Sequence, residues 1–156
     1  MTGLLLRGNG LRGRLPATQK VWSSLSHIQT LSLRSNSLSG PIPGAISLLA
    51  DSLINLNLRR NILSGTIPPQ LGQLSDLVHF SVFTNRISDS IPDQLGNLSL
   101  LGSTEEGGFD LTCNNMSGVI PSTLSSLRNF HNNIGLGGVG SVRCHSTCAG
   151  LCNRWR

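Results

Sequence analysis

Aromatic and charged residues are scarce in this sequence. Tyrosine is absent, and aromatic residues make up only 4% of the 156 positions. Charged residues account for 12%, and because acidic residues are the rarer kind the formal net charge is +5. A core must therefore be packed mainly from leucine and other aliphatic side chains. No apolar run approaches the roughly 20 residues that a helix needs to cross a membrane, so the sequence predicts no membrane span.

Recognisable catalytic sets are lacking as well. The four histidines are far apart in the sequence: His27, His79, His131 and His145. No G-x-S-x-G nucleophile motif occurs. Glu105 and Glu106 are adjacent in a glycine-rich stretch, which is typical of a solvated loop rather than of an acid–base pair. The sequence thus predicts neither an enzyme nor a cofactor site, and no pattern of a nucleic-acid-binding module is visible.

The chain does contain one pattern in five tandem copies, of the form L-x-L-x-x-N-x-L-x-G-x-I-P. Its asparagines follow one another after 27, 25, 24 and 29 residues: Asn9, Asn36, Asn61, Asn85 and Asn114. A period in this range is typical of a leucine-rich-repeat solenoid, an α/β fold. A solenoid offers a long concave face rather than an enclosed cleft, and such faces bind other molecules.

Each residue type in the pattern has a structural role. Alternation of leucine with polar residues, as in Leu31-Ser32-Leu33, predicts a short strand with one buried face. Stacked copies would form a parallel sheet with about 4.8 Å between strands. The asparagines would bond backbone groups left unpaired at each turn and so form a ladder. The glycine suits a turn with positive φ, and residues 70–74 and 94–98 are expected to return as short helical turns.

The L-S-G-x-I-P consensus followed by L-G-x-L resembles the plant-type leucine-rich repeats. The likeness covers roughly residues 3–127 and is strongest at residues 36–43, 61–68 and 114–121. This class includes ectodomains of receptor-like kinases and receptor-like proteins, and polygalacturonase-inhibiting proteins of cell walls. The resemblance implies a right-handed superhelix with a parallel sheet on the concave face and a second, partial sheet on one flank. It also implies extracellular recognition of peptides, proteins or wall saccharides.

The chain departs from that pattern in four places. Residues 1–10 already lie inside a repeat, so neither a signal peptide nor the family's N-terminal cap with paired cysteines is visible. Asp89 replaces the turn glycine of the fourth repeat, and residues 102–108 carry about five extra residues of the fifth. We expect a fragment, a truncated gene product or an imperfect gene model, whose first repeat exposes an apolar end. Residues 1–127 would form five repeats, and residues 128–156 a degenerate repeat or a disordered, cysteine-containing tail.

Outward-facing residues of successive strands should stack into rows on the concave face. The row after the second strand leucine reads Arg7, Arg34, Arg59, Phe83 and Thr112. Like charges about 5 Å apart repel one another unless an anion lies between them, so this row is a candidate carboxylate site. The alternative is a set of solvated arginines. The predicted ligand-binding residues are Arg7, Arg34, Asn57, Arg59, Arg60, His79 and Phe83.

Two further sequence features bear on processing and on the tail. The sequons at Asn97 and Asn115 are candidate glycosylation sites if the protein is secreted. The cysteines that could form disulfides are Cys113, Cys144, Cys148 and Cys152. Their pairing is open, because four cysteines allow three connectivities. Three interpretations of the tail at residues 128–156 remain open: a disulfide-bonded cap, an unstructured segment or, least favoured, a zinc site.

Residues 135–142 match G-x-G-x-x-G-x-V, the phosphate-covering loop of protein kinases. No lysine occurs after Lys20, and neither H-R-D nor D-F-G is present, so this chain is not a kinase. We favour coincidence over a relic of a receptor-kinase gene, because a lone glycine-rich match is weak.

Three functional hypotheses remain open. The favoured one is a recognition segment of a receptor-like kinase or receptor-like protein that acts in signalling or defence. Such a segment would be extracellular or at the cell surface, and plasma-membrane-associated in a full-length parent. Its ligand would be a peptide, a protein or an anionic saccharide, with acidic ligands favoured by the net charge. The second hypothesis is a soluble wall protein that inhibits a polygalacturonase, and the third is a product without independent function.

Overall fold

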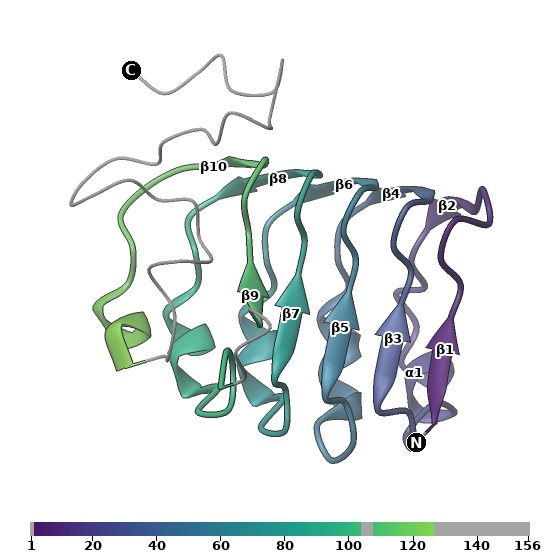
Figure 1. The fold of residues 1–156 in the computed structure, drawn as a ribbon, viewed down its shortest axis with the longest axis horizontal. Coiled ribbons are helices and arrows are strands. Elements are labelled where there is room, and N and C mark those ends of the chain that lie inside the picture. Colours follow the sequence, from purple (N-terminus) through teal and green to yellow (C-terminus); the bar gives the residue numbers. More distant parts are fainter. Residues whose placement is uncertain (1, 104–107, 127–156) are drawn as a thin grey trace.

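The computed structural model describes residues 2–103 and 108–126, and they form a solenoid built on two parallel sheets (Figure 1). The sheet on the concave face has the order β1-β3-β5-β7-β9, and the second has the order β10-β8-β6-β4-β2. The strands of the first sheet are β1 (Gly3–Leu5), β3 (Thr30–Ser32), β5 (Asn55–Asn57), β7 (His79–Ser81) and β9 (Phe109–Asp110). Those of the second are β2 (Arg12–Arg14), β4 (Ser37–Gly40), β6 (Ile62–Gly65), β8 (Arg86–Asp89) and β10 (Asn115–Met116). The predicted α/β solenoid with a second sheet is thus confirmed.

Short helices return the chain on the side opposite the concave sheet. They are α1 (Gln19–Ser23) and the 3-10 helices η1 (Gly44–Leu49), η2 (Pro69–Gln73), η3 (Asp93–Asn97) and η4 (Ser122–Ser126). Pro43, Pro68 and Pro92 each hold extended backbone immediately before one of these helices. Proline fixes φ near −65°, so it ends the second strand of each repeat and starts the return. The helical turns expected at residues 70–74 and 94–98 are confirmed as η2 and η3.

The asparagine ladder is also present. The amide nitrogen of Asn61 donates to the carbonyls of Leu33 and Leu58, both at 3.0 Å, and its oxygen accepts the N–H of Leu38 at 3.1 Å. Asn36, Asn85 and Asn114 repeat the same three kinds of bond in their own repeats. Each asparagine thus joins the strand of its own repeat, the strand before it and the backbone of the second sheet. The ladder satisfies backbone groups that the bends would leave unpaired.

The turn after each strand of the second sheet needs a left-handed residue. Gly40, Gly65 and Gly118 have φ of 73°, 79° and 83°, as the L-S-G pattern predicts. Asp89 occupies the same position in the fourth repeat and adopts φ of 64°. Aspartate tolerates this region better than most residues because its short side chain bonds locally, so the repeat keeps its turn at some cost in strain.

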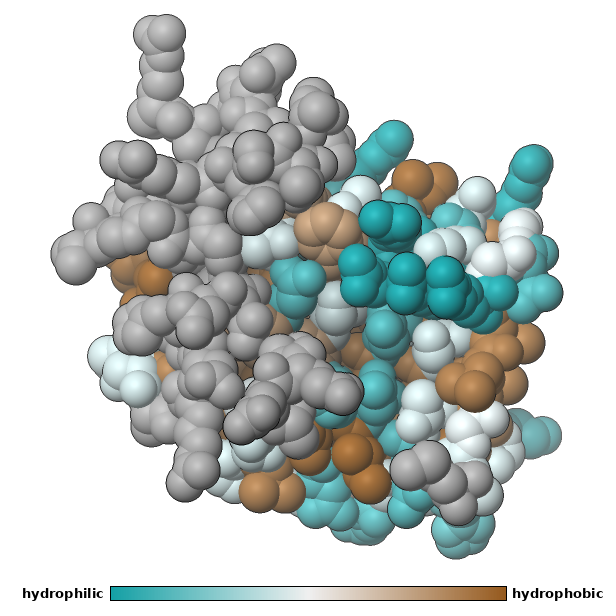
Figure 2. All heavy atoms as spheres, viewed as in Figure 1, coloured by the Kyte–Doolittle hydropathy of each residue, from teal (hydrophilic) through white to brown (hydrophobic). Residues whose placement is uncertain are grey.

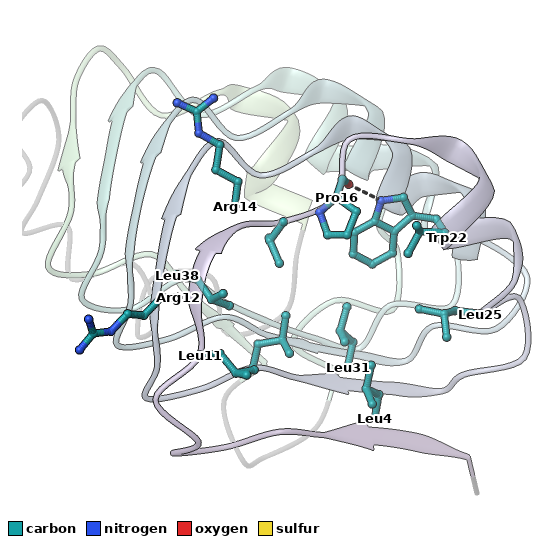
Figure 3. Close-up of a pocket in the computed structure, with 12 residues that line it drawn as sticks. Leu4, Leu11, Arg12, Arg14, Pro16, Trp22, Leu25, Leu31 and Leu38 are labelled. Carbon is teal, nitrogen blue, oxygen red and sulfur yellow. Dashed lines mark hydrogen bonds between the residues drawn. The ribbon is translucent and has the colours of Figure 1, made fainter.

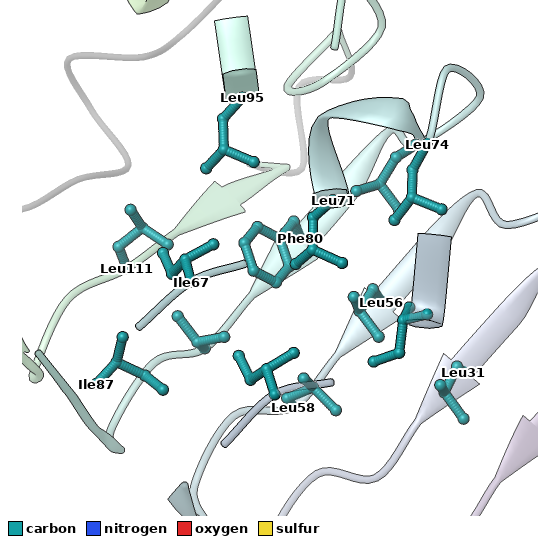
Figure 4. Packing of buried hydrophobic residues seen from close by; sticks show 14 of the residues in the cluster. Leu31, Leu56, Leu58, Ile67, Leu71, Leu74, Phe80, Ile87, Leu95 and Leu111 are labelled. Atoms are coloured by element: carbon teal, nitrogen blue, oxygen red, sulfur yellow. The ribbon is translucent and has the colours of Figure 1, made fainter. Parts of the chain in front are cut away.

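The core is a continuous aliphatic stack between the sheets and the helices. Leu56, Leu58, Leu71 and Ile87 are fully buried, and Figure 4 shows them pointing toward one another from successive repeats. Two aromatic rings enter this stack, because Phe80 replaces a strand leucine and packs against Phe109, with ring centroids 6.1 Å apart. The core is therefore packed mainly from leucine, as the composition requires.

At the β1 end of the solenoid the core is open. A cavity of about 280 Å³ lies among residues of the first two repeats and α1, including Leu4, Leu11, Leu31 and Trp22 (Figure 3). The Trp22 indole N–H donates to the Pro16 carbonyl at 2.8 Å and so holds α1 over the cavity. Leu4 and Leu11 are only partly buried, so this end is apolar, as expected for the first repeat.

No helix within residues 2–103 and 108–126 has the length and apolar character needed to cross a membrane. The same residues contain no group of three or more side chains that could hold a metal ion. The glycine-rich motif at residues 135–142 and the predicted tail at residues 128–156 lie outside the described residues.

Candidate binding surface

The predicted rows of outward-facing residues occur on the concave face, the solvent side of the sheet β1-β3-β5-β7-β9. Strand pairing sets Leu5, Ser32, Asn57, Ser81 and Asp110 beside one another in that order. Backbone hydrogen bonds between neighbouring repeats continue past the strand ends. The N–H of Gly8 donates to the carbonyl of Arg34, and in the same way Ser35 donates to Arg59, Arg60 to Phe83 and Thr84 to Thr112. Arg7, Arg34 and Arg59 therefore stand on adjacent repeats, and we call them the arginine column.

The arginine column brings several like charges close together. Arg34 and Arg59 are half-buried, and the Nε atom of each is buried without a hydrogen-bond partner. Burial lowers the pKa of Arg34, and the positive charges of Arg59, Arg7 and Arg60 lower it further. No carboxylate of the described residues pairs with Arg34 or Arg59. The buried, unpaired guanidinium atoms are thus a cost to the folded chain, which an anion could relieve.

Phe83 occupies the next position of the same row, in the fourth repeat, beside the arginine column. Its ring lies under the Arg59 guanidinium, whose carbon is 5.1 Å from the ring centroid. A cation–π contact of this kind holds the planar guanidinium in one orientation. Figure 2 shows a compact hydrophilic patch beyond the arrow ends of the concave sheet in Figure 1. Charged and aromatic groups are thus presented side by side on one surface.

Arg60 lies beside the column but has a different geometry. It is exposed and holds a left-handed backbone with φ of 55°, the conformation that Gly8, Ser35 and Thr84 adopt at the same position of other repeats. Its side chain belongs to the charged edge of the patch, since its charge contributes to the lowered pKa of Arg34.

A polar pocket of about 220 Å³ adjoins the column. Its lining is Asn55, Leu56, Asn57, Arg59, His79, Phe80, Ser81, Gly108 and Asp110. The structure thus brings together three predicted ligand-binding residues: Asn57, Arg59 and His79. Sequence reasoning did not select Asn55, Ser81 or Asp110 as binding residues. The sequence does place these three residues in the outward-facing rows. The stacking of polar residues over three successive repeats was the signal that could have identified them as binding residues.

Asp110 is the one acidic side chain among the described residues that line this pocket. Its Oδ1 atom accepts hydrogen bonds from the Thr112 backbone N–H at 3.1 Å and from the Thr112 hydroxyl at 2.7 Å. These bonds hold the Oδ1 atom, and the second carboxylate oxygen accepts no hydrogen bond from the described residues. Arg59 lines the same pocket.

The other predicted sites lie away from this surface or outside the described residues. Asn97 is exposed at the end of η3, and Asn115 is exposed in β10, so both sequons are accessible. Cys113 is buried and disulfide-bonded. The other cysteines lie outside the described residues: Cys144, Cys148 and Cys152.

Comparisons with known proteins agree with this architecture. The family profile described as Leucine Rich Repeat matches residues 27–49 and 52–74. A chain of the BIR3–SERK2 complex from Arabidopsis thaliana is similar, with 33% identity and a TM-score of 0.72, over 90% of this chain and 72% of that one. The BIR2 ectodomain from Arabidopsis thaliana is 37% identical with a TM-score of 0.70, over 79% of this chain. This chain spans only 60% of that ectodomain.

A third similar structure was solved with a peptide bound. The ectodomain of the Arabidopsis receptor kinase HAESA, in complex with an N-terminally extended IDA peptide hormone, is 36% identical with a TM-score of 0.67. The match covers 75% of this chain and 19% of that one. No curated protein sequence matches this chain.

The chain has the repeat pattern, two parallel sheets and the asparagine ladder. It is also more than 30% identical to a solved relative over most of that relative's length. The chain therefore belongs to the plant-type leucine-rich-repeat proteins, the family that contains the ectodomains of plant receptor kinases.

Proposed function

We propose that this chain is a recognition module that binds an acidic segment of a peptide or protein on its concave face. The arginine column is the anchor, and Arg34 and Arg59 make the main contacts. Phe83 adds an aromatic surface beside them. The single observation that carries the proposal is the pair of buried, unpartnered Nε atoms in arginines that lack a carboxylate partner among the described residues.

The chemistry of arginine favours a carboxylate over other partners. The guanidinium presents donors in a planar fork that matches two carboxylate oxygens, so one acidic group can bond two nitrogens at once. Hydrogen bonds to charged groups contribute about 1.5–3 kcal/mol each when they are shielded from water. Since Arg34 and Arg59 are half-buried, a bound acid would gain part of this energy and would reduce the repulsion within the column.

A peptide or protein is favoured over a saccharide because similar ectodomains were solved in such complexes. HAESA was solved with a peptide hormone, and BIR3 with SERK2. By the same analogy we place this chain outside the cell or at its surface, as part of a longer signalling or defence receptor. Asn97 and Asn115 would carry glycans there. A soluble inhibitor of polygalacturonase, or a binder of pectic saccharide, is the competing proposal.

The test is binding of capped octapeptides of glycine and serine that carry two aspartates, two asparagines or two lysines. NMR titration of the protein measures each affinity. The aspartate peptide should bind best, and the double variant Arg34→Gln/Arg59→Gln should weaken it about tenfold, which corresponds to 1.4 kcal/mol. Arg12 and Arg86 are exposed on the second sheet. The matched control is therefore Arg12→Gln/Arg86→Gln, which removes the same charge from another surface.

Two outcomes would contradict the proposal. If the control variant weakens binding as much as the column variant, the peptide responds only to net charge and the concave face is not the site. If an oligogalacturonide binds through the column and the aspartate peptide does not, the saccharide proposal replaces this one. Inhibition of a polygalacturonase would then be measured directly.

A further inference from the structure

The polar pocket holds opposite charges that do not neutralise each other. Arg59 and Asp110 line the same cavity of about 220 Å³. Within the part of the chain that the structure describes, neither forms an ion pair. Asp110 is held by hydrogen bonds from Thr112, and the Arg59 guanidinium lies over the ring of Phe83, so each is held by a different neighbour. The pocket therefore presents a cation and an anion to solvent at separate, fixed positions.

Neutral polar groups line the pocket beside the two charges. Asn57 uses its side-chain oxygen to accept the Arg59 backbone N–H at 3.4 Å, and Ser81 uses its hydroxyl oxygen to accept the Phe83 N–H at 3.4 Å. The amide nitrogen of Asn57 and the whole amide of Asn55 make no hydrogen bond to the described residues. These groups offer donors and acceptors of the kind that a peptide backbone needs.

The backbone separation of Arg59 and Asp110 gives the approximate length of a matching ligand. Arg59 and Asp110 are two strands apart in the sheet and two residues apart along the strand direction. With about 4.8 Å between strands and 3.3 Å per residue, their backbones are about 12 Å apart. An extended peptide covers this distance with three to four residues, at about 3.3–3.6 Å each.

We infer that the pocket selects a peptide segment with one acidic and one basic group three to four residues apart. The segment lies across the strands, with its carboxylate on Arg59 and its ammonium group on Asp110. Asn57 and Ser81, which stand in the same row as Asp110, offer hydrogen bonds to the backbone between these two groups. This inference rests on the proposed function, and it adds a second charge and a fixed spacing to the acidic ligand.

The arrangement favours a mixed ligand over the purely acidic ligands that the arginine column alone would accept. A purely acidic segment that satisfied Arg59 would bring negative charge toward Asp110, which repels it. A segment with adjacent opposite charges would reach only one side of the pocket. Opposite charges at the matching spacing satisfy both sides at once.

The experiment uses capped octapeptides of glycine and serine with one aspartate and one lysine, placed one, three, four or six positions apart. NMR titration of the whole chain gives the affinity of each. Peptides with spacings of three and four should bind about threefold more tightly than the others, a typical effect of one solvent-exposed charge pair. Asp110→Asn should abolish this preference and leave the requirement for aspartate intact.

The matched control is Asp76→Asn, which removes an exposed carboxylate from the loop before β7 and should leave the spacing preference unchanged. Affinities that depend on aspartate but not on spacing, or a preference that survives Asp110→Asn, would overturn the inference and leave the proposed function standing. Affinities that do not depend on aspartate at all would overturn both.

Discussion

The asparagine ladder permits a quantitative prediction at Asn85. This side chain is only 3% exposed and takes part in three hydrogen bonds. Its amide nitrogen donates to the Leu58 and Val82 carbonyls at 3.0 and 2.9 Å, and its oxygen accepts the Leu63 N–H at 3.0 Å. Substitution by alanine removes all three bonds at once.

The three backbone groups that bond Asn85 lose different shares of their hydrogen bonds in this variant. The Leu58 carbonyl still accepts from Asn61, and the Val82 carbonyl still accepts from Asn114, so each loses one of two bonds. The Leu63 N–H loses its side-chain acceptor and is left buried. An orphaned donor costs about 1–3 kcal/mol and each lost second bond about 0.5–1 kcal/mol, so Asn85→Ala should cost about 2–5 kcal/mol.

The assay is urea unfolding followed by circular dichroism. A typical domain is stable by about 5–15 kcal/mol, so the predicted loss is a large fraction of the total. With a slope of about 2 kcal/mol per molar urea, the midpoint should fall by roughly 1–2.5 M. The control is Asn55→Ala, which removes the same side chain from a position where it bonds none of the described residues. Equal midpoints for the two variants would refute the role assigned to the ladder.

Three further predictions concern stability and use thermal or urea unfolding. Asp89→Gly should stabilise the chain by about 0.5–1 kcal/mol because φ of 64° suits glycine; a loss would mean that the aspartate side chain supports the turn. Gly72→Ala should cost about 2 kcal/mol or more, because a Cβ would lie 2.2 Å from the Gln94 backbone oxygen. Gly44→Ala meets only a flexible side chain, so it should cost less, and equal losses would contradict this reasoning. Arg34→Met should raise stability by up to about 1 kcal/mol by removing a like charge, and added salt should shrink the gain; a stability loss would show that the column stabilises the fold.

Much of the fold could be predicted from the sequence because the chain repeats itself. In a solenoid each repeat contacts its neighbours, so a local pattern such as Leu31-Ser32-Leu33 fixes both the strand and its register. The five strands of the concave sheet, the asparagine ladder and the helical turns at residues 70–74 and 94–98 all follow from this repeated local pattern. The same rule placed Arg7, Arg34 and Arg59 in one column.

The candidate site could be predicted only in part. Repeat alignment gives the row in which a residue stands, but not how deeply its side chain is covered or whether it finds a partner. The burial of the Arg34 and Arg59 Nε atoms depends on packing between neighbouring side chains. The pocket shared by Arg59 and Asp110 depends on residues that are far apart in the sequence.

The sequence by itself determined the repeat, the direction in which each strand residue faces and the basic character of one surface. These features follow from periods of two residues within a strand and about 25 residues between strands. Only the tertiary structure decided which charges remain unpaired, because pairing depends on distances between side chains of different repeats. It fixed Arg59 over Phe83 and Asp110 beside Thr112, so that among the described residues a cation and an anion line one pocket without pairing.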